Sequence, residues 1–254
     1  MVNMLKSAFL FLVSALCFSI CFTTVLQFAL WLYGTGFSYT TTHRTLETDD
    51  IEKTIILHNL LLILVFVIQH SLMASDYCKH FFTMCKLDVL QRSIYVIATC
   101  AVLQVVMYYW LPLYTDHPVW AFDQRRNILW LILSLVHIIA WLMMFGVILV
   151  IDYGELIGVK QIYYFLTNSP PPMQMKSASN RRMFDNFRHP VLLGLLLVLW
   201  FVPVMTLDRL LLAIFLSLYT CLGHNLDTQD YEYLQSQSQQ KEVHLRTQYS
   251  YWHE

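Results

Sequence analysis

Long apolar runs recur along this chain, and they constrain its fold more than any other feature. A helix needs about 20 apolar residues in succession to cross the hydrocarbon core of a bilayer. The chain is 57% hydrophobic and only 13% charged, whereas soluble domains are about one quarter charged. We therefore predict an all-α fold, a polytopic membrane helical bundle of about six transmembrane helices, over residues 8–32, 54–74, 90–110, 127–151, 191–207 and 210–222.

The last two apolar runs are the shortest and meet at Asp208-Arg209, so they predict a C-terminal helical hairpin with its turn there. Pro203 should kink the first helix of the hairpin or end it early, because proline has no backbone N–H. Tilt or a locally thin bilayer would let such short helices cross, and the alternative is a paired wedge that does not cross fully. Residues 155–166 are too short to span and predict an interfacial helix.

The distribution of basic residues predicts the orientation of the chain. We take residues 1–234 as a single integral-membrane domain and 235–254 as a polar, mobile tail. With six crossings, eleven of the sixteen Lys and Arg residues lie on the side of the two termini, and five lie on the other side. Short loops rich in Lys and Arg favour the cytoplasmic side of a membrane. Both termini are therefore predicted to face the cytoplasm or nucleoplasm.

Composition argues against several other classes of protein. A net charge of −1 argues against direct nucleic-acid binding. The six cysteines form no CxxC pair and no Cys/His spacing typical of zinc sites, so we predict no metal site and reduced thiols. Three histidines lie in apolar runs, and we interpret them as hydrogen-bond partners between helices: His58, His70 and His137.

The two ends of the predicted hairpin carry the candidate site. Arg188-His189-Pro190 opens it, where the exposed N–H groups of a helix start and a cation would suit an anionic group. The alternative for these residues is a positively charged anchor that caps a helix. Asp227 and Asp230 follow the hairpin and share a helix face, so they would accept hydroxyl groups or balance a cation, unless they are simply a solvated face. A hairpin brings its two ends together.

Several strings of the sequence are long enough to be compared with a known family. They are Gln69-His70-Ser71-Leu72-Met73-Ala74, Leu90-Gln91-Arg92-Ser93, Tyr95-Val96, Asp152-Tyr153, Glu155-Leu156, Lys160-Gln161, Tyr163-Tyr164, Arg188-His189-Pro190 and Asp208-Arg209-Leu210-Leu211-Leu212-Ala213. With these strings the chain resembles the nurim family, whose members are multi-pass proteins of the inner nuclear membrane, over nearly its whole length up to Leu234. The resemblance implies localisation in the inner nuclear membrane, with the lipid bilayer as the first partner.

A more distant resemblance is to isoprenylcysteine carboxyl methyltransferases and methanethiol S-methyltransferases, which are membrane enzymes that use S-adenosylmethionine. It lies in Arg188-His189-Pro190, in Gly194 four residues after that proline, and in the acidic stretch after the hairpin. The resemblance implies a methyltransferase-like core with S-adenosylmethionine as cofactor. The cofactor-binding candidates are Gln161, Arg188, His189, Pro190, Gly194, Asp227 and Asp230.

One departure from the enzymes orders the two functional hypotheses. Their post-hairpin segment carries a basic residue followed by paired glutamates, whereas Asn225 stands at the basic position here and only Asp227 remains of the acidic pair. We therefore predict a mainly structural or organisational role. The alternative is an active S-adenosylmethionine-dependent methyltransferase that acts on a lipidic or thiol small molecule within the membrane. Catalytic residues and protein partners are not indicated by the sequence.

Overall fold

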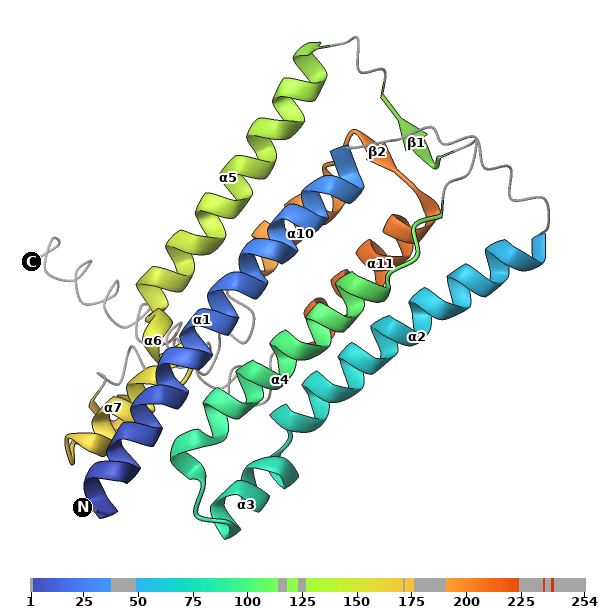
Figure 1. The fold of residues 1–254 in the computed structure, drawn as a ribbon. Coiled ribbons are helices and arrows are strands. Elements are labelled where there is room, and N and C mark those ends of the chain that lie inside the picture. The colour runs from blue at the N-terminus through green and yellow to red at the C-terminus, as the bar shows by residue number, and fades with distance from the viewer. Residues whose placement is uncertain are drawn as a thin grey trace, which may run out of the picture.

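The computed structural model describes residues 2–37, 49–113, 118–122, 127–170, 172–175 and 191–223, together with residues 235 and 239. Long helices dominate these residues, and Figure 1 shows them side by side in one bundle. The helices are α1 Val2–Phe37, α2 Asp49–Ala74, α3 Asp76–Met84, α4 Asp88–Tyr109, α5 Asn127–Ile151, α6 Tyr153–Leu156, α7 Val159–Leu166, α8 Pro172–Met175, α10 Leu192–Trp200 and α11 Leu207–Gly223. The two short strands are β1 Trp120–Ala121 and β2 Val204–Met205.

Four of the described helices are long and apolar enough to cross a membrane: α1, α2, α4 and α5. Their outer faces expose large apolar side chains, such as Phe11 at 71%, Leu61 at 52% and Leu142 at 66%. Water does not tolerate so much exposed apolar surface, whereas the acyl chains of a bilayer do. The structure therefore agrees with an all-α polytopic membrane protein in contact with lipid. A total of six spans stays a prediction.

The helix at the start of the predicted hairpin is shorter than its apolar run. α10 ends at Trp200, three residues before Pro203, so the proline ends the helix early as predicted. The chain then extends into β2, which pairs antiparallel with β1 through Trp120↔Met205 and Ala121↔Val204. At nine residues, α10 is about 14 Å long, which is less than half the thickness of a hydrocarbon core.

The predicted turn at Asp208-Arg209 is wrong. Both residues lie in the first turn of α11, and both are buried, Asp208 at 3% and Arg209 at 1% exposure. Two charged residues in a row look like a solvated turn, but here Arg209 bonds to the ends of other helices. The connection that the sequence placed there lies earlier, at residues 201–206.

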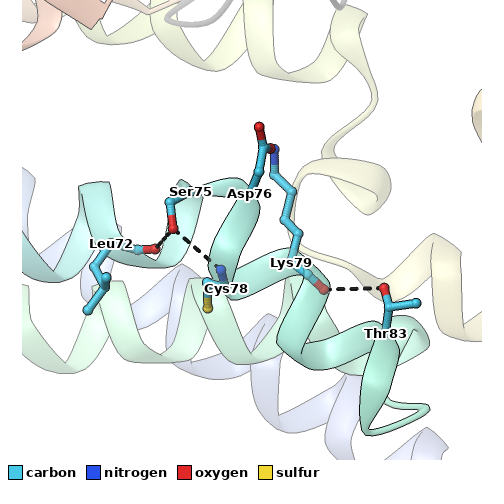
Figure 2. Close-up of polar contacts among 6 residues, drawn as sticks. All are labelled: Leu72, Ser75, Asp76, Cys78, Lys79 and Thr83. Carbon is cyan, nitrogen blue, oxygen red and sulfur yellow. Dashed lines mark hydrogen bonds and ion pairs between the residues drawn. The ribbon is translucent and has the colours of Figure 1, made fainter.

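Two further elements differ from the prediction. The interfacial segment 155–166 is not one helix but two, because Gly158 adopts φ +88°, in the left-handed region that only glycine enters easily. The connection after the second span contains α3. Ser75 caps this helix: its Oγ accepts from Cys78 N–H at 3.4 Å and donates to Leu72 O at 2.6 Å, as Figure 2 shows. Asp76 lies in the first turn of α3, where a carboxylate interacts favourably with the helix dipole.

The hydrophobic core joins six of the described helices, and α10 is one of them. α10 packs against α5 on one side and α11 on another, α11 contacts α2, and α4 lies against both α1 and α2. Figure 1 shows that α3, α6 and α7 lie near the start of α1 and that both strands lie at the opposite end of the bundle. We call the end of the bundle that contains α3, α6 and α7 the α7 end, and the end that contains β1 and β2 the strand end. Buried members of the core are Leu32, Ile63, Val106, Trp110, Ala140, Met144, Val198, Leu199, Leu212, Ala213 and Leu216.

Candidate functional site

Two of the predicted site residues can be placed in the structure, namely Gln161 on α7 and Gly194 on α10. They contact different elements. The other candidates lie outside the described residues: Arg188, His189, Pro190, Asp227 and Asp230. Gln161, Gly194 and the residues around them are therefore the part of the predicted site that the structure describes.

Gln161 lies where α7 packs back on α6. Its Nε2 donates to the carbonyl oxygen of Glu155 at 3.1 Å. Its Oε1 is buried, and it has no hydrogen-bond partner among the described residues. A buried acceptor of this kind is costly unless a donor reaches it. The side chain is thus positioned to accept a hydrogen bond from a hydroxyl or an ammonium group.

Gly194 brings two helices into close contact. A Cβ at this position would lie 2.3 Å from Cγ of Met144 and 3.0 Å from the carbonyl oxygen of Ala140, both on α5. No side chain fits at such distances, so glycine is needed for α10 to approach α5 this closely. Within the described residues, the role of Gly194 is helix packing.

Asp152 organises the corner formed by α6 and α7. It has φ +93°, and its Oδ1 accepts from Glu155 N–H at 3.3 Å to cap α6. Its Oδ2 forms an ion pair with Nζ of Lys160. The hydrogen bond that Lys160 donates to Asp152 raises the pKa of Lys160 above its ordinary value. Lys160 also lies over the ring of Tyr164, at 5.6 Å from the centroid. Asp152 and Lys160 thus join α6 to α7 with little net charge.

The same corner is attached to α1 and α4. Nε of Arg92 donates to the carbonyl oxygen of Leu156 at 2.7 Å, and Sγ of Cys17 donates to that of Ile157 at 3.2 Å. Gly158 packs directly on α4, because a Cβ there would lie 2.6 Å from Oγ of Ser93. These contacts hold the segment of α6 and α7 against α1 and the second turn of α4.

Polar aromatic contacts connect α2 to its neighbours near the α7 end. The hydroxyl of Tyr95 lies 2.7 Å from Nε2 of His70, and Thr99 Oγ1 lies 3.4 Å from Nδ1 of the same ring. Ser71 and Tyr219 bond through their hydroxyls at 3.0 Å. His70 and Ser71 therefore bond α2 to α4 and α11.

The strand end holds a polar cluster that the sequence did not predict. Nη1 of Arg209 donates to Leu32 O at 2.8 Å and to Thr35 Oγ1 at 2.6 Å, and Nη2 donates to Val198 O at 3.2 Å. Trp110 Nε1 donates to Asp208 Oδ2 at 3.0 Å. In the sequence, this cluster is marked only by two charged residues, Asp208 and Arg209, between apolar runs, and that pattern fits a solvated turn equally well.

The sequence predicts that the histidines of the apolar runs form hydrogen bonds between helices, and His58 and His70 do so. Nε2 of His58 lies 3.0 Å from the carbonyl oxygen of Tyr109 on α4. His70 bonds across to α4, and His137 is buried at 3% exposure in α5. Among the described residues, no group of three or more His, Cys, Asp or Glu side chains is suited to hold a metal ion.

Comparison with known proteins identifies relatives over most of the chain. A Nurim of Xenopus laevis is 46% identical over 186 residues, covering 71% of this chain and 64% of the relative. The Nurim of Homo sapiens is 45% identical over 186 residues, covering 72% and 70%. That of Danio rerio is 39% identical over 199 residues, covering 76% and 70%. The chain belongs to the nurim family. No family model and no solved structure matches it.

Proposed function

We propose that this nurim-family chain is a structural or organisational multi-pass protein of the inner nuclear membrane. Its termini face the nucleoplasm or cytoplasm, and its helices form a methyltransferase-like core. The observation that carries the structural role is the use of polar groups within the bundle. Arg209 is fully buried, and its described bonds go to the ends of α1 and α10 rather than to an open site.

Other polar side chains of the long helices support the same proposal. Asn59 is buried at 0% exposure and forms a reciprocal pair with the backbone of Leu111, through Nδ2 to O at 2.7 Å and through Oδ1 to N at 3.1 Å. Gln104 on α4 donates to Thr24 Oγ1 on α1 at 3.2 Å. Polar groups in apolar surroundings that bond neighbouring helices stabilise the bundle. Location at the nuclear envelope rests on the family resemblance.

The structural role is tested by separating the scaffold from the predicted site. Full-length protein fused to a fluorescent protein is expressed in cells, and its retention at the nuclear envelope is measured by photobleaching. Gln161→Ala and His189→Ala are expected to be retained as wild type, whereas Arg209→Met should lower both the amount and the retention. Loss of retention in folded Gln161→Ala protein would contradict the proposal.

A second candidate function is an active S-adenosylmethionine-dependent methyltransferase. One observation favours it: Oε1 of Gln161 is a buried acceptor without a described partner, on the side of the bundle where the family resemblance locates the cofactor. S-adenosylmethionine carries an ammonium group and ribose hydroxyls that would donate to such an acceptor. The substrate would be a lipidic or thiol compound that enters from the bilayer.

The enzyme hypothesis is tested by cofactor binding to the purified full-length chain in detergent. A ligand that binds only the native state raises its unfolding temperature according to mass action. The hypothesis expects S-adenosylmethionine to produce such a shift, and expects a smaller shift in Gln161→Ala and Asp227→Ala variants. No shift at millimolar cofactor, with wild-type protein that unfolds cooperatively, would reject the enzyme and leave the structural role.

A further inference from the structure

Basic residues of three different helices gather where α7 meets α1 and α4. Lys6 lies near the start of α1, Arg92 is in the second turn of α4, and Lys160 is on α7. α7 contacts both long helices, and Figure 1 shows it beside the first turns of α1. We call this region the α7 corner. Two of its cations are already engaged: Lys160 pairs with Asp152, and Nζ of Lys6 lies 5.1 Å from the ring centroid of Phe165.

Arg92 differs from these cations because it is fixed but not neutralised. Its Nε is bonded to Leu156 O at 2.7 Å, and its guanidinium lies 5.3 Å from the ring centroid of Tyr95. Glu155 acts on it electrostatically, but no ion pair to Arg92 within 4.0 Å exists among the described residues. Both Nη groups of this exposed side chain therefore keep their donors available.

A guanidinium held in this way is suited to a planar or tetrahedral oxyanion. Its fork of N–H groups matches two oxygens of a phosphate or carboxylate, and prior orientation lowers the entropy lost on binding. The ring of Tyr95 lies beside the guanidinium, and the hydroxyl of Tyr95 is itself bonded to His70 at 2.7 Å. A lysine at this position would offer a point charge without the fork.

The surroundings of Arg92 identify the kind of molecule that carries the anion. α4 is apolar and long enough to cross the membrane, and Arg92 lies in its second turn, so a bilayer crossed by α4 would have its headgroups near this residue. The neighbouring elements expose apolar side chains: Leu87 just before α4 at 40%, and Tyr163 and Phe165 on α7 at 60% and 43%. Acyl chains would cover these side chains while the headgroup meets the cation.

We propose that the α7 corner binds a phospholipid of the adjoining leaflet, with the lipid phosphate on the two Nη groups of Arg92. Lys6 adds positive charge that favours an anionic headgroup. The proposal goes beyond the structural role, since a scaffold requires no particular lipid. It is also independent of cofactor binding, because Gln161 takes no part in it.

The test measures binding of short-chain lipids to the delipidated full-length protein in detergent, through the unfolding temperature. Dihexanoyl phosphatidic acid is expected to raise this temperature in a saturable way, whereas dihexanoylglycerol, which has the same tails and no phosphate, should not. Arg92→Gln should raise the dissociation constant for the lipid about tenfold or more, because the charge-assisted hydrogen bonds between the guanidinium and the phosphate are lost. Arg92→Lys keeps the charge without the fork and should fall between the two.

Lys86→Gln provides the matched control, because it removes one exposed cation from the same end of the bundle. Its affinity for the lipid should stay close to that of wild type. An equal loss in Lys86→Gln and Arg92→Gln would mean that only total charge matters and would overturn the proposal. Unchanged affinity in folded Arg92→Gln or Arg92→Lys protein would overturn it as well. An equal stabilisation by inorganic phosphate would assign the site to a free anion instead of a lipid.

Discussion

Replacement of Arg209 by methionine tests whether one buried cation holds the strand end together. No carboxylate among the described residues lies within 4.0 Å of the guanidinium, yet Arg209 is only 1% exposed. Its acceptors explain this. Leu32 and Thr35 lie near the C-terminus of α1, and Val198 lies in the last turn of α10, where a backbone carbonyl lacks a partner within its own helix. The partial negative charge at two helix C-termini stabilises the cation.

The magnitude follows from the three hydrogen bonds. A hydrogen bond to a charged group contributes about 1.5–3 kcal/mol, and part of this sum offsets the several kcal/mol that burial of a charge costs. Methionine fills a similar volume but leaves the carbonyl of Val198 without its donor. We expect the free energy of unfolding to fall by about 3–5 kcal/mol, which is what remains of the three hydrogen bonds after that offset.

The assay is thermal unfolding of purified protein in detergent, followed by tryptophan fluorescence. A loss of this size should lower the midpoint by about 10 °C in a chain of this length. Arg209→Lys keeps the charge but reaches fewer acceptors, and should recover part of the loss. Lys53→Met, whose side chain is 72% exposed at the same end, should change stability by about 0.5 kcal/mol or less. The reasoning fails if Arg209→Met unfolds within a degree or two of wild type.

Three further predictions concern other contacts of the bundle. Gly158→Ala should lower stability by about 1–3 kcal/mol, because the left-handed φ and the contact with α4 both exclude a Cβ, while Gly146→Ala, which meets nothing within 4 Å, should not destabilise. Asn59→Leu should cost about 2–4 kcal/mol in thermal unfolding, since it leaves a backbone N–H and a carbonyl unpaired. The raised pKa of Lys160 means that its pair with Asp152 contributes fully below the ordinary lysine pKa and is lost as the pH rises through the folded value. Wild type should therefore lose stability above about pH 10 more steeply than Asp152→Asn, and parallel pH profiles would contradict this.

Apolar length predicted the long helices well, because hydrophobic matching to a bilayer depends on composition over many residues and little on tertiary contacts. α5 spans Asn127–Ile151, the predicted interval, and α4 begins two residues and ends one residue earlier than predicted. α1 begins six residues earlier and ends five residues later than predicted, and α2 begins five residues earlier. The segment after Trp200 was harder to predict. Its residues are apolar enough to continue a helix, but Pro203 lacks an N–H, and the pairing of β2 with β1 satisfies the backbone instead.

The candidate site was harder to predict than the fold, because its polar groups bond to partners far away in the sequence. Arg209 was interpreted as part of a turn, since no local pattern shows that the ends of α1 and α10 converge on it. Gly158 was interpreted as part of a helix, although its position beside Ser93 is a tertiary contact. Gln161 was singled out through family resemblance, and the structure adds an acceptor without a described partner.

The two ends of the bundle differ in how accessible their polar groups are, and this difference supports the proposal that ligands bind at the α7 end. At the strand end, Arg209 bonds to α1 and α10 and Asn59 bonds to a loop; Nε of Arg209 and Oδ1 of Asp208 have no described partner, but both residues are buried, at 1% and 3% exposure. At the α7 end, Arg92 keeps two Nη groups available and Gln161 keeps one buried oxygen, although both side chains are anchored by a first hydrogen bond. A side chain that one hydrogen bond already holds in place, and that still has unused donors or acceptors, loses little conformational entropy when it binds a ligand. Ligands should therefore bind at the α7 end, and variants at the strand end should alter ligand binding only through stability.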